Sequence, residues 1–191
     1  MEETIHADGA LSEPVYQLTD RQLFMLGLLA RKQLTQHASY PLTLNATSRI
    51  CARQPRLNRQ PVPDSEVQRD AHLLASYGLI TIDNSRRSER YAHNLASTLS
   101  LQNNELALLS VLLTHGPCRA SQINELVAPM HEFDNLNAMC QVLYRHRLFK
   151  NELRHSGSAI EIFHHDLEQI LISISVCLLA LSMLTAGTTE V

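Results

Sequence analysis

The sequence predicts a mainly α-helical protein that carries small β-hairpins and ends in a hydrophobic helix. Three observations lead to this fold class. Apolar residues recur at helical spacing through most of the chain, short β-type runs follow sets of three helices, and the whole order of elements occurs twice. A chain of 191 residues has room for two small domains of about 80 residues each.

Three helices are predicted in the first unit. Thr19 and Gln22 have the spacing of a capping box, so a helix should begin between them. Thr43 is the expected N-cap of a second helix. A third helix should follow, with Asp64 or Ser65 as its cap and an inward stripe at residues 67, 71 and 74.

A hairpin of two short strands, at residues 79–82 and 89–93, should complete this unit. Three helices followed by a hairpin is the order of a winged helix, a helix-turn-helix fold. The same order then recurs, with helices from Asn104, Ser121 and Asp134 and a hairpin that pairs residues 148–153 with 160–163. We therefore predict two tandem winged-helix domains. The predicted boundaries are an acidic tail at 1–16, domains at 17–98 and 99–165, and a hydrophobic C-terminal helix at 166–191.

Charge is distributed unevenly along the chain, although the formal net charge is only −3. Residues 1–20 carry five acidic and no basic side chains, whereas residues 21–63 carry seven basic and no acidic ones. A basic block of this kind is typical of a surface that binds a polyanion. The alternative is a solvated basic face without a partner.

The sequence shows no motif for catalysis or for a cofactor. Its four cysteines are Cys51, Cys118, Cys140 and Cys177. They lie far apart, which favours reduced, structural thiols in a cytoplasmic protein. His164, His165 and Asp166 resemble a metal site, but exposure at a strand end explains them better because no third ligand has a characteristic spacing. We expect a protein that is not an enzyme and that binds no cofactor and no metal.

The chain resembles a known family in several stretches. They include Gly27-Leu28-Leu29-Ala30-Arg31-Lys32-Gln33, Tyr40-Pro41-Leu42-Thr43-Leu44-Asn45, Asn58-Arg59-Gln60-Pro61-Val62, Ser65-Glu66-Val67, Glu105-Leu106-Ala107-Leu108-Leu109 and Met130-His131-Glu132-Phe133. Through them, residues 17–165 resemble the YceH family of uncharacterised bacterial proteins. The resemblance implies tandem winged-helix domains and no particular activity. The chain departs from the family at Arg31 and Gln60, where the family usually has acidic residues, and its loop between Cys51 and Asn58 is two residues longer.

In a winged helix the third helix reads DNA while cations on flanking elements contact phosphates. The candidates for such contacts are Arg49, Arg53, Arg56, Asn58, Arg59, Gln68, Arg69, His72, Arg86 and Arg87. We expect the exposed face of the third helix to be mixed in charge, with Glu66 and Asp70 beside Arg69. For Asn58 and Arg59, an alternative role is to fix a long loop through backbone hydrogen bonds.

The second unit is acidic, so its expected partner is a protein and not a nucleic acid. Residues 170–186 form an uncharged run that approaches the length of a bilayer span. We favour packing of this segment in a homodimer or across the two domains, with a membrane anchor as the alternative because acidic flanks suit an anchor poorly. The expected function is that of a DNA-binding regulator that binds double-stranded DNA. A protein–protein interaction adaptor, associated with the membrane through this segment, is the alternative.

Overall fold

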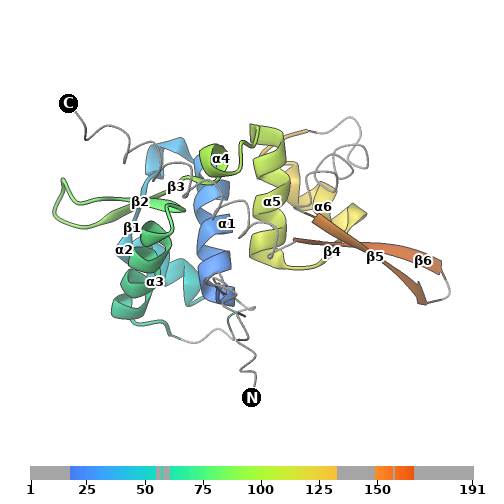
Figure 1. The fold of residues 1–191 in the computed structure, drawn as a ribbon, viewed down its shortest axis with the longest axis horizontal. Helices are drawn as coiled ribbons and strands as arrows, with labels where there is room; N and C mark the ends of the chain where they lie inside the picture. Colours follow the sequence, from blue (N-terminus) through green and yellow to red (C-terminus); the bar gives the residue numbers. More distant parts are fainter. Residues whose placement is uncertain (1–17, 55–56, 58–60, 133–148, 157, 166–191) are drawn as a thin grey trace, which may run out of the picture.

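The computed structural model describes residues 18–54, 57, 61–132, 149–156 and 158–165. These residues form a mainly helical structure with two small antiparallel sheets of three strands each. Two helices lie side by side at the centre, and a hairpin extends from each end of the molecule (Figure 1). The predicted acidic tail, the third helix of the second unit and the C-terminal helix lie outside the described residues.

We call the elements from α1 to β3 the first unit. They are α1 (Asp20–Thr35), the 3-10 helix η1 (His37–Ser39), β1 (Leu42–Thr43), α2 (Leu44–Cys51), α3 (Asp64–Ser76), β2 (Ile80–Asp83) and β3 (Arg90–His93). The sheet has the order β1-β3-β2, and both pairings are antiparallel. A short helix, α4 (Leu95–Thr98), follows.

We call the elements from α5 to β6 the second unit. They are α5 (Asn103–His115), β4 (Cys118–Arg119), α6 (Ala120–Val127), β5 (Phe149–Ser156) and β6 (Ser158–His165). The sheet order β4-β6-β5 repeats that of the first unit, with a short first strand at one edge. Even the register corresponds, because Leu42 pairs with Tyr91 in one sheet and Cys118 with Phe163 in the other.

Local signals explain where the helices begin and end. The predicted capping box at Thr19 is present. The Thr19 hydroxyl accepts from the backbone amide of Gln22, and the side-chain oxygen of Gln22 accepts from the backbone amide of Thr19. Thr43 caps α2 as predicted. Gly78 follows the C-cap of α3, Tyr77, and adopts a φ of 70°, a left-handed conformation that favours glycine.

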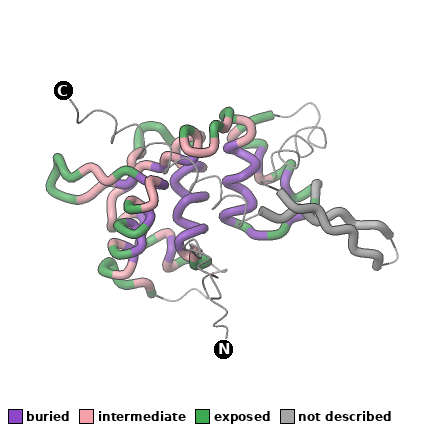
Figure 2. The backbone as a smooth tube through the Cα atoms, viewed as in Figure 1, coloured by how far each residue is buried: buried purple, intermediate pink, exposed green. Residues whose placement is uncertain are grey.

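The core is shared between the two units. Residues 22–30 of α1 and residues 106–114 of α5 are buried on every side, so these two helices form the centre of the described structure (Figure 2). The close approach depends on Gly27. A Cβ atom there would lie 2.7 Å from the Leu113 Cβ and 2.9 Å from both the Ser110 carbonyl oxygen and the Thr114 Cγ2. The sequence did not reveal this contact.

Several boundaries differ from the predictions. Pro63 and not Asp64 or Ser65 occupies the N-cap of α3, and Gln102 and not Asn104 caps α5. The second hairpin is longer than predicted, with eight residues in each strand. Two strands, β1 and β4, were missed because two residues are too short to show an alternating pattern.

No helix within the described residues is both long enough and apolar enough to cross a membrane. The run at residues 170–186 lies outside those residues, so neither its packing nor its insertion into a membrane is tested.

Candidate nucleic-acid interface

Three elements of the first unit carry the described candidate residues. Arg49 lies on α2 and Arg53 in the turn that follows it. Gln68, Arg69 and His72 lie on α3, which packs against α2. Arg86 and Arg87 lie in the loop that joins β2 to β3. The remaining candidates, Arg56, Asn58 and Arg59, lie outside the described residues, so both interpretations of that loop stay predictions.

The described arginines of this face are open to solvent. Arg49, Arg53, Arg69, Arg86 and Arg87 are all exposed. None of the five forms an ion pair with another residue that the structure describes. Their charges are therefore available to a ligand, whereas the other described cations of the basic block are engaged or half-buried. Arg21 forms ion pairs, Lys32 donates to Gln36 at 2.7 Å, and Arg31 is half-buried.

The outward face of α3 is less acidic than the sequence predicted. Asp70 was expected to be exposed beside Arg69, but its relative exposure is 6%. It occupies the inward stripe with Val67, Ala71 and Leu74. The periodicity rule misplaced it because the rule assigns charged residues to the solvent side, and here a partner on another helix satisfies the buried carboxylate.

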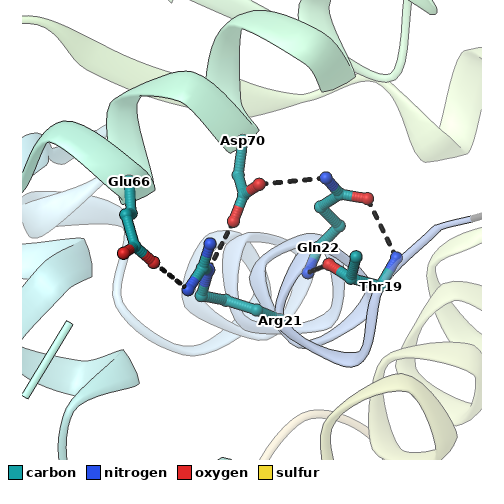
Figure 3. Close-up of polar contacts among 5 residues, drawn as sticks. All are labelled: Thr19, Arg21, Gln22, Glu66 and Asp70. Atoms are coloured by element: carbon teal, nitrogen blue, oxygen red, sulfur yellow. Dashed lines mark hydrogen bonds and ion pairs between the residues drawn. The ribbon is translucent and has the colours of Figure 1, made fainter. Parts of the chain in front are cut away.

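That partner is Arg21, in the first turn of α1 (Figure 3). Its Nε donates to Asp70, and its Nη1 donates to the Glu66 carboxylate at 2.6 Å. Gln22 completes the group, because its amide nitrogen donates to Asp70 at 2.9 Å while its amide oxygen belongs to the capping box. We call these four residues, Arg21, Gln22, Glu66 and Asp70, the α1–α3 clamp. One arginine thus holds two of the three acids of α3, while the third, Asp64, is exposed at the first residue of the helix.

The two carboxylates of the α1–α3 clamp stabilise the charged form of Arg21. Burial by itself lowers the pKa of Arg21, but hydrogen bonds and charge from Asp70 and Glu66 outweigh burial and raise the pKa overall. Because Arg21 neutralises part of their charge, Glu66 and Asp70 repel an approaching polyanion less than two free carboxylates would. The exposed polar residues of α3 are then Asp64, Ser65, Arg69, His72 and Ser76, with Leu73 the one exposed large apolar side chain among the described residues.

The loop between β2 and β3 presents its arginines at the far end of the hairpin (Figure 1). Asp83 accepts from the Ser85 amide at 2.9 Å, which shapes the start of the loop. Hydrogen bonds from Ser85, together with the charges of Arg86 and Arg90, lower the pKa of Asp83. The Arg90 guanidinium, in contrast, is not available to a ligand at its Nη1, which donates to the Pro41 carbonyl at 3.2 Å.

Two candidate residues on α3, Gln68 and His72, contact Glu89, which the sequence did not identify as a candidate. His72 Nε2 lies 3.3 Å from Glu89 Oε1, and the Gln68 side chain also hydrogen-bonds to Glu89. Both Glu89 and Arg21 were missed because their partners are about 17 and 45 or more residues away in sequence. One signal was available for Arg21: Glu66 and Asp70 are one helical turn apart, the spacing at which a single arginine reaches two carboxylates.

Described residues include no group of three or more metal-ligating side chains. His164 and His165 lie on β6, and their side chains and Asp166 are outside the description. The two described cysteines, Cys51 and Cys118, are both buried, and burial raises the pKa of the Cys51 thiol to about 12. A thiol with that pKa is not a nucleophile at neutral pH.

Comparison with known proteins gives a family but no activity. A family model described as "Protein of unknown function, DUF480" matches residues 18–170. A UPF0502 protein of Burkholderia multivorans is 34% identical over 127 residues, which is 64% of this chain and 53% of the relative. A UPF0502 protein of Cupriavidus taiwanensis is 33% identical over 119 residues, 60% of this chain and 48% of the relative.

The chain spans about half the length of the curated relatives that it matches. The matches agree with the resemblance to the YceH family that the sequence stretches indicated. The family match covers both units and so includes every candidate residue. The chain therefore belongs to the family of proteins of unknown function described as DUF480.

Proposed function

We propose that this chain is a non-enzymatic DNA-binding regulator, that its two units are tandem winged-helix domains, and that the first unit carries the DNA-binding face. One observation carries the proposal. Two of the three acids of α3, Glu66 and Asp70, are held by Arg21, while five arginines on α2, the turn after it, α3 and the β2–β3 loop stay exposed and form no ion pair among the described residues.

The arrangement of elements supports the winged-helix part of the proposal. In each unit a long helix, a short edge strand and a short helix precede an antiparallel hairpin, and the edge strand pairs with the second strand of that hairpin. In a winged helix, the helix before the hairpin enters the major groove and the hairpin contacts the flanking backbone. In the first unit these elements are α3 and the β2–β3 hairpin.

Arginine chemistry supports the ligand class. The guanidinium group forms paired hydrogen bonds with phosphate oxygens, and it also fits the guanine edge in the major groove. Arg86 and Arg87 are placed at a hairpin tip, where they suit phosphates or the minor groove. Arg69 is on the outward face of α3, where it suits a base edge or a phosphate.

The test is duplex DNA binding over a series of salt concentrations, measured by fluorescence anisotropy. We expect the wild-type affinity to fall steeply with salt. The triple variant Arg53→Gln/Arg86→Gln/Arg87→Gln should have a slope shallower by about three, because each lost phosphate contact lowers the slope by about one. Arg119→Gln, an exposed arginine of the second unit, is the matched control and should leave the slope unchanged.

Two outcomes would overturn this function. Absence of binding by the wild type at low salt would exclude a DNA-binding face. An equal loss of slope in Arg119→Gln would exclude its assignment to the first unit. Absence of DNA binding would favour the alternative function, a protein–protein interaction adaptor.

We propose a protein partner, or a second copy of this chain, for the second unit. The exposed residues of α6 are Ser121, Gln122, Asn124 and Glu125, which include an acid and no base. Such a face gains nothing from phosphates. Deletion of residues 166–191 distinguishes a second copy of this chain from a different protein partner. A homodimer formed through that segment should become a monomer in sedimentation, while a dimer that persists would contradict that route of assembly.

A further inference from the structure

Glu89 lies at the junction between the β2–β3 loop and α3. It follows Arg87 by two residues and directly precedes β3. Its carbonyl oxygen accepts from the amide of Leu44, the first residue of α2, at 3.2 Å. The backbone of Glu89 is therefore fixed against the start of α2, so the position of its side chain is set by the fold.

The carboxylate of Glu89 has three hydrogen-bond partners. Tyr91 donates its hydroxyl to Oε2 at 2.8 Å, His72 Nε2 lies 3.3 Å from Oε1, and the Gln68 side chain is the third. Burial by itself raises the pKa of Glu89, but these hydrogen bonds and the charge of His72 outweigh it, so the pKa is lowered and the group is ionised at neutral pH. Its side chain is 20% exposed.

Gln68 and His72 are one turn apart on α3, and both belong to the candidate DNA-binding face. A side chain that is already held in one orientation loses less conformational entropy when it binds a base edge. Glutamine suits the adenine edge, and a histidine ring nitrogen can donate or accept there. One carboxylate thus holds two side chains that point from the same helix.

A carboxylate beside such a face has a second effect. It repels phosphates, and this repulsion acts on every DNA sequence alike. Contacts from Gln68 and His72 offset the repulsion only where the bases match. Repulsion of all sequences combined with attraction of a few is a physical means of discrimination.

We propose that Glu89 is a specificity-determining positioning residue of the DNA-binding face. It orients Gln68 and His72 toward base edges, and its negative charge weakens binding to unmatched DNA. This inference rests on the proposed function, and it adds that the protein discriminates among sequences.

The experiment compares wild type with Glu89→Gln, an uncharged variant of nearly the same shape. The probes are a duplex enriched from a random pool by the wild-type protein and a shuffled duplex of the same composition. In Glu89→Gln we expect affinity for the shuffled duplex to rise about threefold, because a repulsive charge is lost. We expect the ratio of the two affinities to fall about tenfold, because Gln68 and His72 lose their fixed partner.

Glu125→Gln, the same change on the exposed face of α6, is the matched control and should alter neither quantity. A second variant, Gln68→Ala/His72→Ala, should lower the ratio to a similar level without raising affinity for the shuffled duplex. Adding Glu89→Gln to that variant should lower the ratio no further, because its effect acts through the two side chains.

The outcomes distinguish a failure of this inference from a failure of the proposed DNA-binding function. A wild type that binds no duplex overturns both. A wild type that binds DNA but enriches no sequence overturns the inference alone. An unchanged ratio in Glu89→Gln also overturns it, as does an equal loss of affinity for both duplexes, which would indicate a merely structural role.

Discussion

Helices α2 and α6 occupy the same place in the two units but expose opposite charges. Each has eight residues and follows a two-residue strand. The eighth residues, Cys51 and Val127, are both fully buried. The sixth residues, Arg49 and Glu125, are both exposed. The inward positions are thus constrained by packing, whereas the outward charge is independent of the fold, so a repeated architecture can serve two different partners.

The largest effect that should distinguish the units is acid instability of the first unit. His93 ends β3, is 7% exposed, and has an Nε2 atom with no hydrogen-bond partner within the described residues. Its Nδ1 accepts from the Leu95 amide at 3.2 Å, and its own amide donates to the Tyr40 hydroxyl at 2.7 Å. Burial lowers the pKa of His93 from 6.5 to about 4. The unfolded chain therefore binds the proton more tightly than the folded one.

Stability should be complete above pH 6.5 and should decrease by about 3 kcal/mol as the pH falls to 4, at about 1.4 kcal/mol per pKa unit. Urea unfolding at pH 7, 6, 5 and 4 measures this. His93→Phe should flatten the dependence over that range. If His93→Phe loses as much stability between pH 7 and pH 4 as the wild type does, other groups cause the effect.

The second prediction addresses the contact that joins the units. Gly27→Ala should lower the free energy of unfolding by about 1–3 kcal/mol, because its Cβ would be forced against Leu113 and Ser110. Helix propensity alone predicts the opposite sign, a gain of about 1 kcal/mol. Ser121→Ala, at an exposed position of α6, should change stability by less than about 0.5 kcal/mol. A stabilised Gly27→Ala protein, measured by chemical denaturation, would contradict the close packing of α1 on α5.

The third prediction compares the second residue of each central helix. In α1 this residue is Arg21 of the α1–α3 clamp, and in α5 it is Asn104, whose side-chain oxygen accepts from the Glu105 amide. Arg21→Met should cost about 1–2 kcal/mol, because Asp70 stays buried without its cation and Arg21 is itself partly exposed. Asn104→Met should cost less. Thermal unfolding of both variants at one pH compares the two losses of stability. An equal loss would show that the α1–α3 clamp does not distinguish the first unit from the second.

The smallest expected effect tests the α2–α6 comparison directly. Arg49→Glu should weaken duplex binding by about three- to tenfold at physiological salt, because an attractive charge is replaced by a repulsive one. Glu125→Arg makes the reverse change at the matching position and should leave the affinity unchanged. Tighter binding by Glu125→Arg would show that the second unit also faces DNA.

The sequence predicted the three helices and the hairpin of the first unit because helix caps and apolar spacing are local signals. Thr19 and Thr43 cap α1 and α2 as the sequence predicted. The contacts between helices were not predictable in this way. Gly27 shows no local turn or break, and only the approach of α5 explains it. The candidate face was found as a set of basic residues, but its electrostatics were not, since the placement of Asp70 and the contact of Glu89 with His72 depend on residues distant in sequence.

The packing of α1 on α5 also has a geometric consequence. Because both helices belong to one continuous core, the β2–β3 and β5–β6 hairpins extend from opposite ends of a common packed centre (Figure 1). A ligand that contacted both hairpins would therefore have to span the shared core that lies between them.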